Sequence, residues 1–235
     1  MRTHRVHSAM SKSIVLLSGG LDSATTLAIA KQESDEVYAL TFDYGQRHRK
    51  EVERAKAIAD QLGVKEHKIL EIGLDELGGS ALTDASEPIP DYRDFETMKE
   101  EIPSTYVPAR NLVLLSCALA WSEALGAGAI YIGANARDYS GYPDCRPSFY
   151  KAFQRAAELG TRSGVENHAA EIRHPLINMR KADIIKRGVD LGVPFELTWS
   201  CYRGGETPSG KCDSCRIRMK GFVEAGLDDP LSYDG

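Results

Sequence analysis

Short apolar runs alternate with stretches of helical periodicity along most of this 235-residue chain. Runs rich in aliphatic and β-branched residues predict strands at Ser13–Leu17, Val37–Phe42, His67–Ile72, Ala129–Gly133 and Glu171–His174. Apolar positions at helical spacing predict helices at Leu21–Gln32, Arg49–Leu62, Asn111–Leu125, Tyr150–Arg162 and Lys181–Leu191. The alternation predicts an α/β fold, with a doubly wound, mostly parallel sheet covered by helices on both faces.

Ligands of such sheets bind beyond the carboxyl ends of the strands, and unusual residues gather there in this chain. Residues 42–46 follow the second predicted strand, and residues 135–146 follow the fourth. Between them, Gly73 to Pro103 carries many turn-forming and charged residues, which predicts a long loop or insertion.

The first predicted strand leads into a glycine turn at its carboxyl end, made of Ser18, Gly19, Gly20, Leu21, Asp22 and Ser23. Adjacent glycines let the backbone approach a ligand, and the start of the following helix presents N–H groups that suit an anion. A carboxylate beside phosphate needs an intervening cation, so we expect Asp22 to bind Mg²⁺. The alternative is an ordinary tight turn with a helix-capping Asp or Ser, and the turn alone does not decide.

Two cations stand at predicted helix starts, where the helix dipole does not favour positive charge. Arg110 precedes a helix expected to begin near Asn111, a good N-cap residue, and Lys181 lies in the first turn of a later helix. Both placements are consistent with binding of phosphate or carboxylate groups. A solvated loop arginine and an ordinary surface lysine are the alternatives.

The segment 135–147 holds two aspartates, two tyrosines and two arginines. A planar heterocycle could use carboxylates for its N–H groups, tyrosine rings for stacking and arginine for a carboxylate. The alternative is a polar surface loop.

Five cysteines at irregular spacing favour a metal site over a disulfide framework. Cys201, Cys212 and Cys215 could bind zinc, although a structural zinc site normally has four ligands, and a redox pair is the alternative. Cys117 lies in an apolar helix, where core burial explains it. Cys145 could be a nucleophile or a packing residue.

Composition narrows the range of partners. With 29 basic and 34 acidic residues, the net charge of −5 provides no global basic field for nucleic acid. No apolar run approaches the length of a membrane span. We expect a mobile leader at residues 1–11, an α/β domain at 12–198, a zinc-binding segment at 199–235, and a reducing cytoplasmic location.

The glycine turn matches the S-G-G-x-D-S loop of the ATP pyrophosphatases, and the chain resembles their 7-cyano-7-deazaguanine synthase family from about Lys12 to Phe222. The stretches that carry the resemblance are Ser18–Ser23, Phe42–His48, Val107–Asn111, Asp138–Arg146 and Gly210–Cys215. A tRNA-modifying member of the same superfamily and a non-catalytic nucleotide- or zinc-binding module are the alternatives.

The resemblance implies that ATP, 7-carboxy-7-deazaguanine and ammonia react through an adenylate and an amide to give 7-cyano-7-deazaguanine. It implies that the glycine turn binds ATP and Mg²⁺ and that Asp22, Lys181 and Arg110 act in catalysis. It further implies that the deazaguanine is bound by Asp138, Tyr139, Asp144 and Arg146. It also implies a homodimer with bound zinc and no nucleic-acid or membrane partner. Family members usually carry a fourth cysteine where this chain has Ser209.

Overall fold

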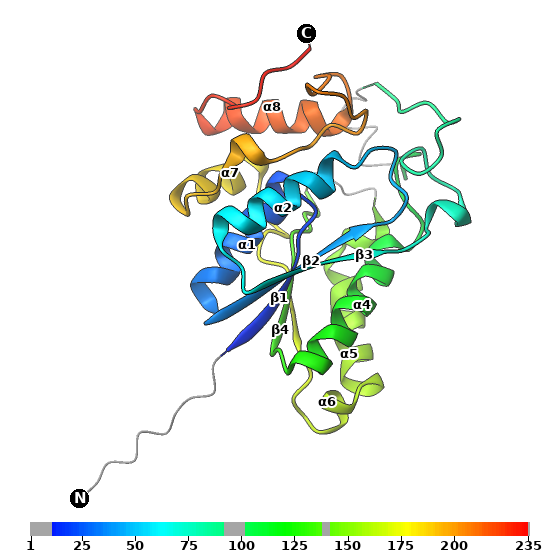
Figure 1. Cartoon of the computed structure of the whole chain (residues 1–235), viewed down its shortest axis with the longest axis vertical. Coiled ribbons are helices and arrows are strands. Elements are labelled where there is room, and N and C mark those ends of the chain that lie inside the picture. The colour runs from blue at the N-terminus through cyan, green and yellow to red at the C-terminus, as the bar shows by residue number, and fades with distance from the viewer. Residues whose placement is uncertain (1–10, 92–101, 138–141, 235) are drawn as a thin grey trace, which may run out of the picture.

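Five parallel strands form a single sheet in the order β3-β2-β1-β4-β5. The computed structural model describes residues 11–91, 102–137 and 142–234 (Figure 1). The strands are β1 (Lys12–Leu16), β2 (Glu36–Asp43), β3 (Glu66–Glu71), β4 (Ala129–Ile132) and β5 (Glu171–Arg173). The predicted α/β fold with a parallel sheet is confirmed, and each strand lies within one residue of its predicted bounds.

Helices cover both faces of the sheet (Figure 1). One face carries α1 (Leu21–Glu33), α2 (Lys50–Leu62) and α7 (Lys181–Asp190), with α8 (Asp213–Ala225) packed on α7. The other carries α4 (Arg110–Leu125) and α5 (Pro147–Gly160), followed by the short α6 (Arg162–Val165). In the described part of the chain, no helix combines the length and apolar character needed to cross a bilayer.

The central strand β1 contributes side chains to two separate hydrophobic cores, one on each face of the sheet. Ile14 and Leu16 pack toward α4 and α5, whereas Val15 and Leu17 pack toward α1, α2 and α7. All four side chains are buried, as expected for a parallel strand covered on both faces. This burial explains why the strand reads as a continuous apolar run rather than an alternating one.

Helix α4 begins differently from the prediction. Ala109, not Asn111, stands at the N-cap position, with a left-handed backbone (φ 54°). The backbone N–H of Ala109 donates to the Tyr106 hydroxyl, and the N–H of Asn111 donates to Asp144. The acceptor for the first turn of α4 therefore comes from a distant loop, so the prediction that Asn111 caps this helix was wrong.

Other boundaries shift by a few residues. The helix predicted at Tyr150–Arg162 begins at Pro147, a residue that favours first helical positions, and is followed by the separate α6. The region after Gly73 is irregular through Asp91 except for the 3₁₀ turn η1 (Asp75–Leu77). Two further 3₁₀ turns, η2 (Pro143–Cys145) and η3 (Phe195–Leu197), precede α5 and the cysteine-containing segment.

The segment after Thr198 has a small cluster of its own, built from Trp199 and the cysteines Cys201, Cys212 and Cys215. Its helix α8 also contributes Phe222 to the core beneath α7. The division of the chain at residue 198 stays a prediction.

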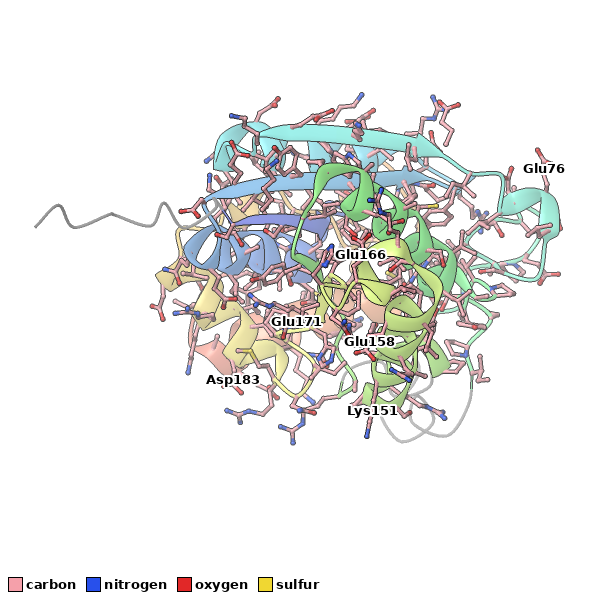
Figure 2. The ribbon with its side chains drawn as sticks, turned by 90° about the horizontal axis from the view of Figure 1, so that it is seen from below. Glu76, Lys151, Glu158, Glu166, Glu171 and Asp183 are labelled. Carbon is pink, nitrogen blue, oxygen red and sulfur yellow. The ribbon has the colours of Figure 1, made fainter. Side chains whose placement is uncertain are left out.

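Charged side chains occupy the outside of this framework. Glu76, Lys151 and Glu166 point outward from η1, α5 and the end of α6 (Figure 2). The charged groups that concern the site lie instead at the carboxyl edge of the sheet.

Candidate active site and metal centre

A cavity of about 240 Å³ opens at the carboxyl ends of β1, β2 and β4. The chain crosses from sheet to helix at each of these ends, which is where parallel sheets bind ligands. Polar residues lining the cavity are Ser18, Asp22, Ser23, Tyr44, Gln46, Glu51, Arg110, Asn111, Asn135, Tyr142, Cys145, Lys181, Ser200, Tyr202, Ser214 and Arg218. The glycine turn, Arg110 and Lys181 were expected in one site from the sequence, and they share this cavity.

Serine hydroxyls close the glycine turn. The backbone N–H of Ser18 donates to Ser23 Oγ over 3.1 Å, and this hydroxyl donates to the carbonyl of Gly20 over 3.0 Å. Gly20 holds the N-cap position of α1, and no side chain caps that helix. The alternative of a turn with a helix-capping Asp or Ser is therefore not what forms here.

The two glycines of the turn have different roles. Gly19 has a left-handed backbone (φ +84°), and a Cβ there would lie 2.3 Å from the carbonyl oxygen of Glu51 in α2. Gly20 has an ordinary negative φ, and a Cβ there would meet its neighbours at 3.4 Å or more. Gly19 is thus required by the packing of α2 on the turn, while Gly20 leaves the cavity side of the backbone open.

Asp22 and Lys181 form a partly buried ion pair that lines the cavity. Lys181 Nζ lies 2.7 Å from both carboxylate oxygens of Asp22, and Lys181 is only 8% exposed. Helix α8 makes room for the lysine, because a Cβ on Gly221 would lie 2.3 Å from Lys181 Cγ. The contribution of Gly221 was not predicted from the sequence.

Arg110 enters the cavity from the start of α4. Its Nη1 donates to the Tyr44 hydroxyl over 3.3 Å, and its guanidinium carbon lies 5.6 Å from the centre of the Tyr44 ring. Glu51, in the first turn of α2, lines the same cavity. Burial raises the pKa of Glu51 to about 7, against the opposing charge of Arg110. Glu51 was missed, although an acidic residue just after the polar loop that follows β2 was a usable signal.

The segment 135–147 contributes fewer of its expected ligands to the cavity than the sequence predicted. Asp138 and Tyr139 lie outside the described residues. Asp144 is buried, accepts the N–H of Asn111 over 3.1 Å and is not part of the cavity lining. Arg146 is exposed at the N-cap position of α5. The structure therefore does not bring Asp144 and Arg146 together with Asp22 and Lys181.

Cys145 does reach the cavity. Asn111 Nδ2 donates to its sulfur over 3.6 Å. Burial, reinforced by the nearby Asp144, raises the pKa of Cys145 to about 12. The group is a neutral thiol at physiological pH, which favours packing over nucleophilic catalysis. Cys117 packs beside the core on the α4 side of the sheet, as its apolar surroundings predicted.

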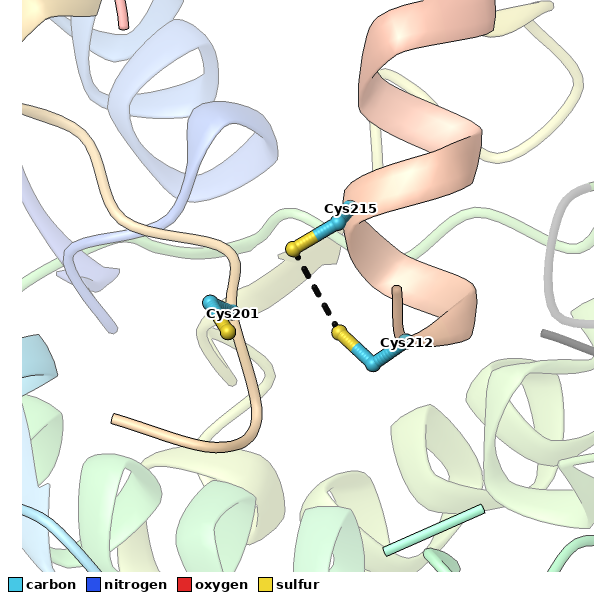
Figure 3. A group of neighbouring side chains, drawn as sticks. All are labelled: Cys201, Cys212 and Cys215. Atoms are coloured by element: carbon cyan, nitrogen blue, oxygen red, sulfur yellow. Dashed lines mark hydrogen bonds between the residues drawn. The ribbon is translucent and has the colours of Figure 1, made fainter. Parts of the chain in front are cut away.

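Three buried cysteine thiols converge at the amino end of α8 (Figure 3). The sulfur atoms of Cys201, Cys212 and Cys215 lie within 4.8 Å of one another. The N–H of Ser209 donates to Cys201 Sγ over 3.4 Å, and Ser209 Oγ lies 3.4 Å from the same sulfur. Hydrogen bonds from the other two thiols, followed by those from Ser209, lower the pKa of Cys201. Such a set of thiols fits a tetrahedral metal ion.

The cysteine segment also forms one wall of the cavity. Trp199 donates its backbone N–H to the carbonyl of Gly19 over 2.9 Å and its indole N–H to the carbonyl of Cys201 over 2.8 Å. Ser200 and Tyr202, the neighbours of Cys201 in sequence, line the cavity. The cysteine cluster is therefore joined directly to the glycine turn.

Arg47 holds the loop that contains Leu82, a residue of the cavity lining. The Arg47 guanidinium donates to the backbone carbonyls of Ala81, Ala85 and Glu87 over 3.0–3.4 Å. Because one guanidinium binds three carbonyls along the loop, it holds the loop backbone in place. Arg47 was part of a recognised motif, but its role as a support for this loop was not predicted.

Sequence comparisons agree on one family. The model of the queuosine biosynthesis protein QueC matches residues 12–226. The 7-cyano-7-deazaguanine synthase of Trichodesmium erythraeum is 56% identical over 220 residues, which cover 94% of this chain and 99% of that protein. The 7-cyano-7-deazaguanine synthase of Thermosynechococcus vestitus is 56% identical over 222 residues, with coverage of 94% and 95%.

A solved structure shares the fold at low sequence identity. It is a 4-thiouridine synthetase in complex with RNA and bound ATP, with a TM-score of 0.50 and 19% identity. The likeness covers 92% of this chain and 50% of that one, and at this identity it shows a common fold alone.

Proposed function

This chain belongs to the family of the queuosine biosynthesis protein QueC, and we propose that it converts 7-carboxy-7-deazaguanine and ammonia to 7-cyano-7-deazaguanine with ATP. Relatives over 50% identical along nearly the whole chain carry the name of that activity. The observation that carries the proposal within this chain is the Asp22–Lys181 pair, which lies partly buried beside the glycine turn in the cavity.

The proposal assigns the ATP phosphates to the glycine turn, Ser18 to Ser23. The backbone N–H groups at the start of α1 attract the phosphates, and the hydroxyls of Ser18 and Ser23 add donors beside them. Lys181 then stabilises the negative charge that develops as pyrophosphate departs. Adenylation turns a poor leaving oxygen of the carboxylate, and later of the amide, into a good one.

Asp22 is the residue that would hold Mg²⁺ beside these phosphates. Both of its carboxylate oxygens already bind Lys181, so the ion fits only once ATP phosphates have taken over the lysine. Bound there, Mg²⁺ would neutralise phosphate charge.

Arg110 is proposed to bind the substrate carboxylate or a phosphate. Asp144 supports it indirectly, because its carboxylate holds the N–H of Asn111 and so fixes the start of α4. Asp138, Tyr139 and Arg146 are proposed as deazaguanine ligands from the family resemblance. Arg146 has the least support, since it is exposed and outside the cavity lining.

Zinc fits the three buried thiols, and we propose that Cys201, Cys212 and Cys215 hold it. Ser209 lies beside them where a fourth thiolate would complete the set, so a hydroxyl or a water takes that position. When bound, zinc supplies a structural cross-link between the loop at Cys201 and the start of α8. Free thiols at all five cysteines are in keeping with a reducing cytoplasm.

A homodimer is part of the proposal. Helix α4 supports it, because it is apolar around most of its circumference, and Leu112 is 47% exposed. A helix apolar all round is normally covered on all sides. Sedimentation equilibrium of the purified protein tests this point, and a monomer at micromolar concentration would contradict it.

The decisive experiment mixes the protein with Mg-ATP, ammonium and 7-carboxy-7-deazaguanine and follows all products by mass spectrometry. The nitrile together with AMP and pyrophosphate is the expected result. Failure to form AMP from folded, zinc-loaded protein would overturn the proposal. A salt-dependent shift of tRNA in a parallel binding assay would then favour a tRNA-modifying activity.

A further inference from the structure

We propose that Glu51 accepts a proton from ammonium in the cavity, producing the ammonia that attacks the adenylated substrate. This role rests on the function proposed above and adds a catalytic residue to it.

Glu51 lies in the first turn of α2, directly after the polar loop that follows β2. Its carboxylate lines the cavity that also contains Asp22 and Arg110. Packing fixes the backbone at this point, because the carbonyl of Glu51 lies against Gly19 of the ATP turn. The backbone of Glu51 is therefore held against the turn that would carry ATP, and its side chain lines the same cavity as that turn.

Within the described ranges, no residue donates a hydrogen bond to the Glu51 carboxylate. Glu51 is only partly buried, so its carboxylate is open to a donor that enters the cavity from solvent. Ammonium is a compact donor of N–H bonds and carries the complementary charge. A partly buried cavity carboxylate is therefore a suitable binding partner for it.

The other acidic groups of the cavity are engaged or neutral. Among the described lining residues the carboxylates are Asp22 and Glu51, and Asp22 is paired with Lys181. Burial raises the pKa of Tyr44, of Tyr142 and of the Cys145 thiol, so these groups keep their protons near neutral pH. Among the described lining residues, Glu51 therefore remains as the group that can accept a proton near neutral pH.

The surroundings of Glu51 tune its basicity. Burial raises its pKa to about 7, the guanidinium of Arg110 on α4 lowers it, and Cys201 on the cysteine segment raises it slightly. The Asp22–Lys181 pair from α1 and α7 and the Tyr44 hydroxyl line the same space. A base whose pKa lies near the working pH is in its most effective range for proton transfer.

The proton balance of amide formation requires such a group. Ammonium has no lone pair and must first pass one proton to a base, here Glu51. The nitrogen lone pair then forms a C–N bond with the carbonyl carbon, and the C–O bond to AMP breaks with its electrons leaving on the phosphate. The extra proton on the new C–N group passes to the departing phosphate, and Glu51 returns its proton to water.

The test compares wild type with Glu51→Gln, which keeps the size of the side chain but removes its basicity. Substrate-dependent exchange of labelled pyrophosphate into ATP reports adenylation without ammonia, and we expect it to be unchanged. Amide and nitrile formation from ammonium should fall by about 100-fold. Glu53→Gln, on an exposed position of the same helix, is the matched control and should change neither rate.

Hydroxylamine distinguishes proton transfer from a structural role. It is largely unprotonated at neutral pH, so it attacks the adenylate without a base, and Glu51→Gln should form hydroxamate at nearly the wild-type rate. Equal loss of rate with ammonium and hydroxylamine would overturn the inference, as would a full ammonium rate in Glu51→Gln. Absence of pyrophosphate exchange in the wild type would instead contradict the proposed function itself.

Discussion

Lys181 Nζ lies 2.7 Å from both carboxylate oxygens of Asp22, although the two residues are 159 positions apart in the sequence. The pair joins the first turn of α1 to the first turn of α7, so two elements that would act on ATP are already attached to each other. In a partly buried setting the charges compensate one another, and removal of either has both a structural and a chemical effect.

Asp22→Ala should abolish substrate-dependent pyrophosphate exchange and also destabilise the fold by about 3 kcal/mol, because Lys181, which is only 8% exposed, loses its partner charge. Urea unfolding and the exchange assay measure the two effects. Asp183→Asn breaks the more exposed Arg180–Asp183 pair at the start of the same helix α7, and that change should leave stability nearly unchanged. Full exchange activity in Asp22→Ala would remove this carboxylate from the mechanism.

Gly19→Ala and Gly20→Ala should behave differently. Alanine at position 19 combines a left-handed backbone with a Cβ 2.3 Å from the Glu51 carbonyl, so we expect a loss of several kcal/mol or failure to fold. Alanine at position 20 has space, and its variant should fold with a weakened affinity for ATP. Thermal unfolding and ATP titration check both, and equal stability of the two variants would contradict the packing role of Gly19.

Ser209→Cys should strengthen zinc binding. A fourth thiolate beside Cys201, Cys212 and Cys215 completes a tetrahedral site, and we expect affinity to rise at least tenfold (about 1.4 kcal/mol). Competition with a chromophoric chelator measures the affinity, with Ser116→Cys on exposed α4 as a control thiol. Wild type should still bind one zinc per chain, and unchanged affinity in Ser209→Cys would place the serine outside the metal's coordination sphere.

Glu51→Gln should stabilise the protein at high pH but not at low pH. The pKa of this carboxyl rises from 4.5 to about 7 on folding, so the folded state binds its proton more tightly and wild-type stability falls as pH rises through that window. The gain from glutamine should be near zero below pH 4.5 and approach about 3 kcal/mol above pH 7. Urea unfolding at pH 5 and pH 8 measures it, and a gain independent of pH would argue that Glu51 is not buried as a proton-binding group.

The sheet, its parallel topology and most helix positions were predictable, because fully buried strands and amphipathic helices leave a local periodic signal. Helix α8 was not predicted, since its buried positions include Asp213, Ser214 and Arg218 and so break the apolar pattern. Arg218 is only 2% exposed and is satisfied by Asp229 and Thr198, partners that only the folded chain brings near.

The residues of the candidate site were also predictable only where their sequence neighbourhood carried a signal. Asp22, Lys181 and Arg110 could be placed near one another because their charges contradict the local helix dipoles or stand at a glycine turn. The position of Asp144 could not be foreseen, because its partner is a backbone N–H of another helix. Glu51 carries an ordinary acidic signature in sequence, and its special state arises from burial, which is a property of the assembled cavity.

The hydrogen bond from the Trp199 N–H to the Gly19 carbonyl ties the earliest functional loop of the chain to one of its last segments. During synthesis on the ribosome, residues 18–23 emerge long before Trp199 and Lys181 exist. A nascent chain can therefore form β1 and α1 without forming a competent nucleotide site. Premature termination before Lys181 yields a product that lacks both a wall and a cation of the cavity, so such incomplete chains would not consume ATP.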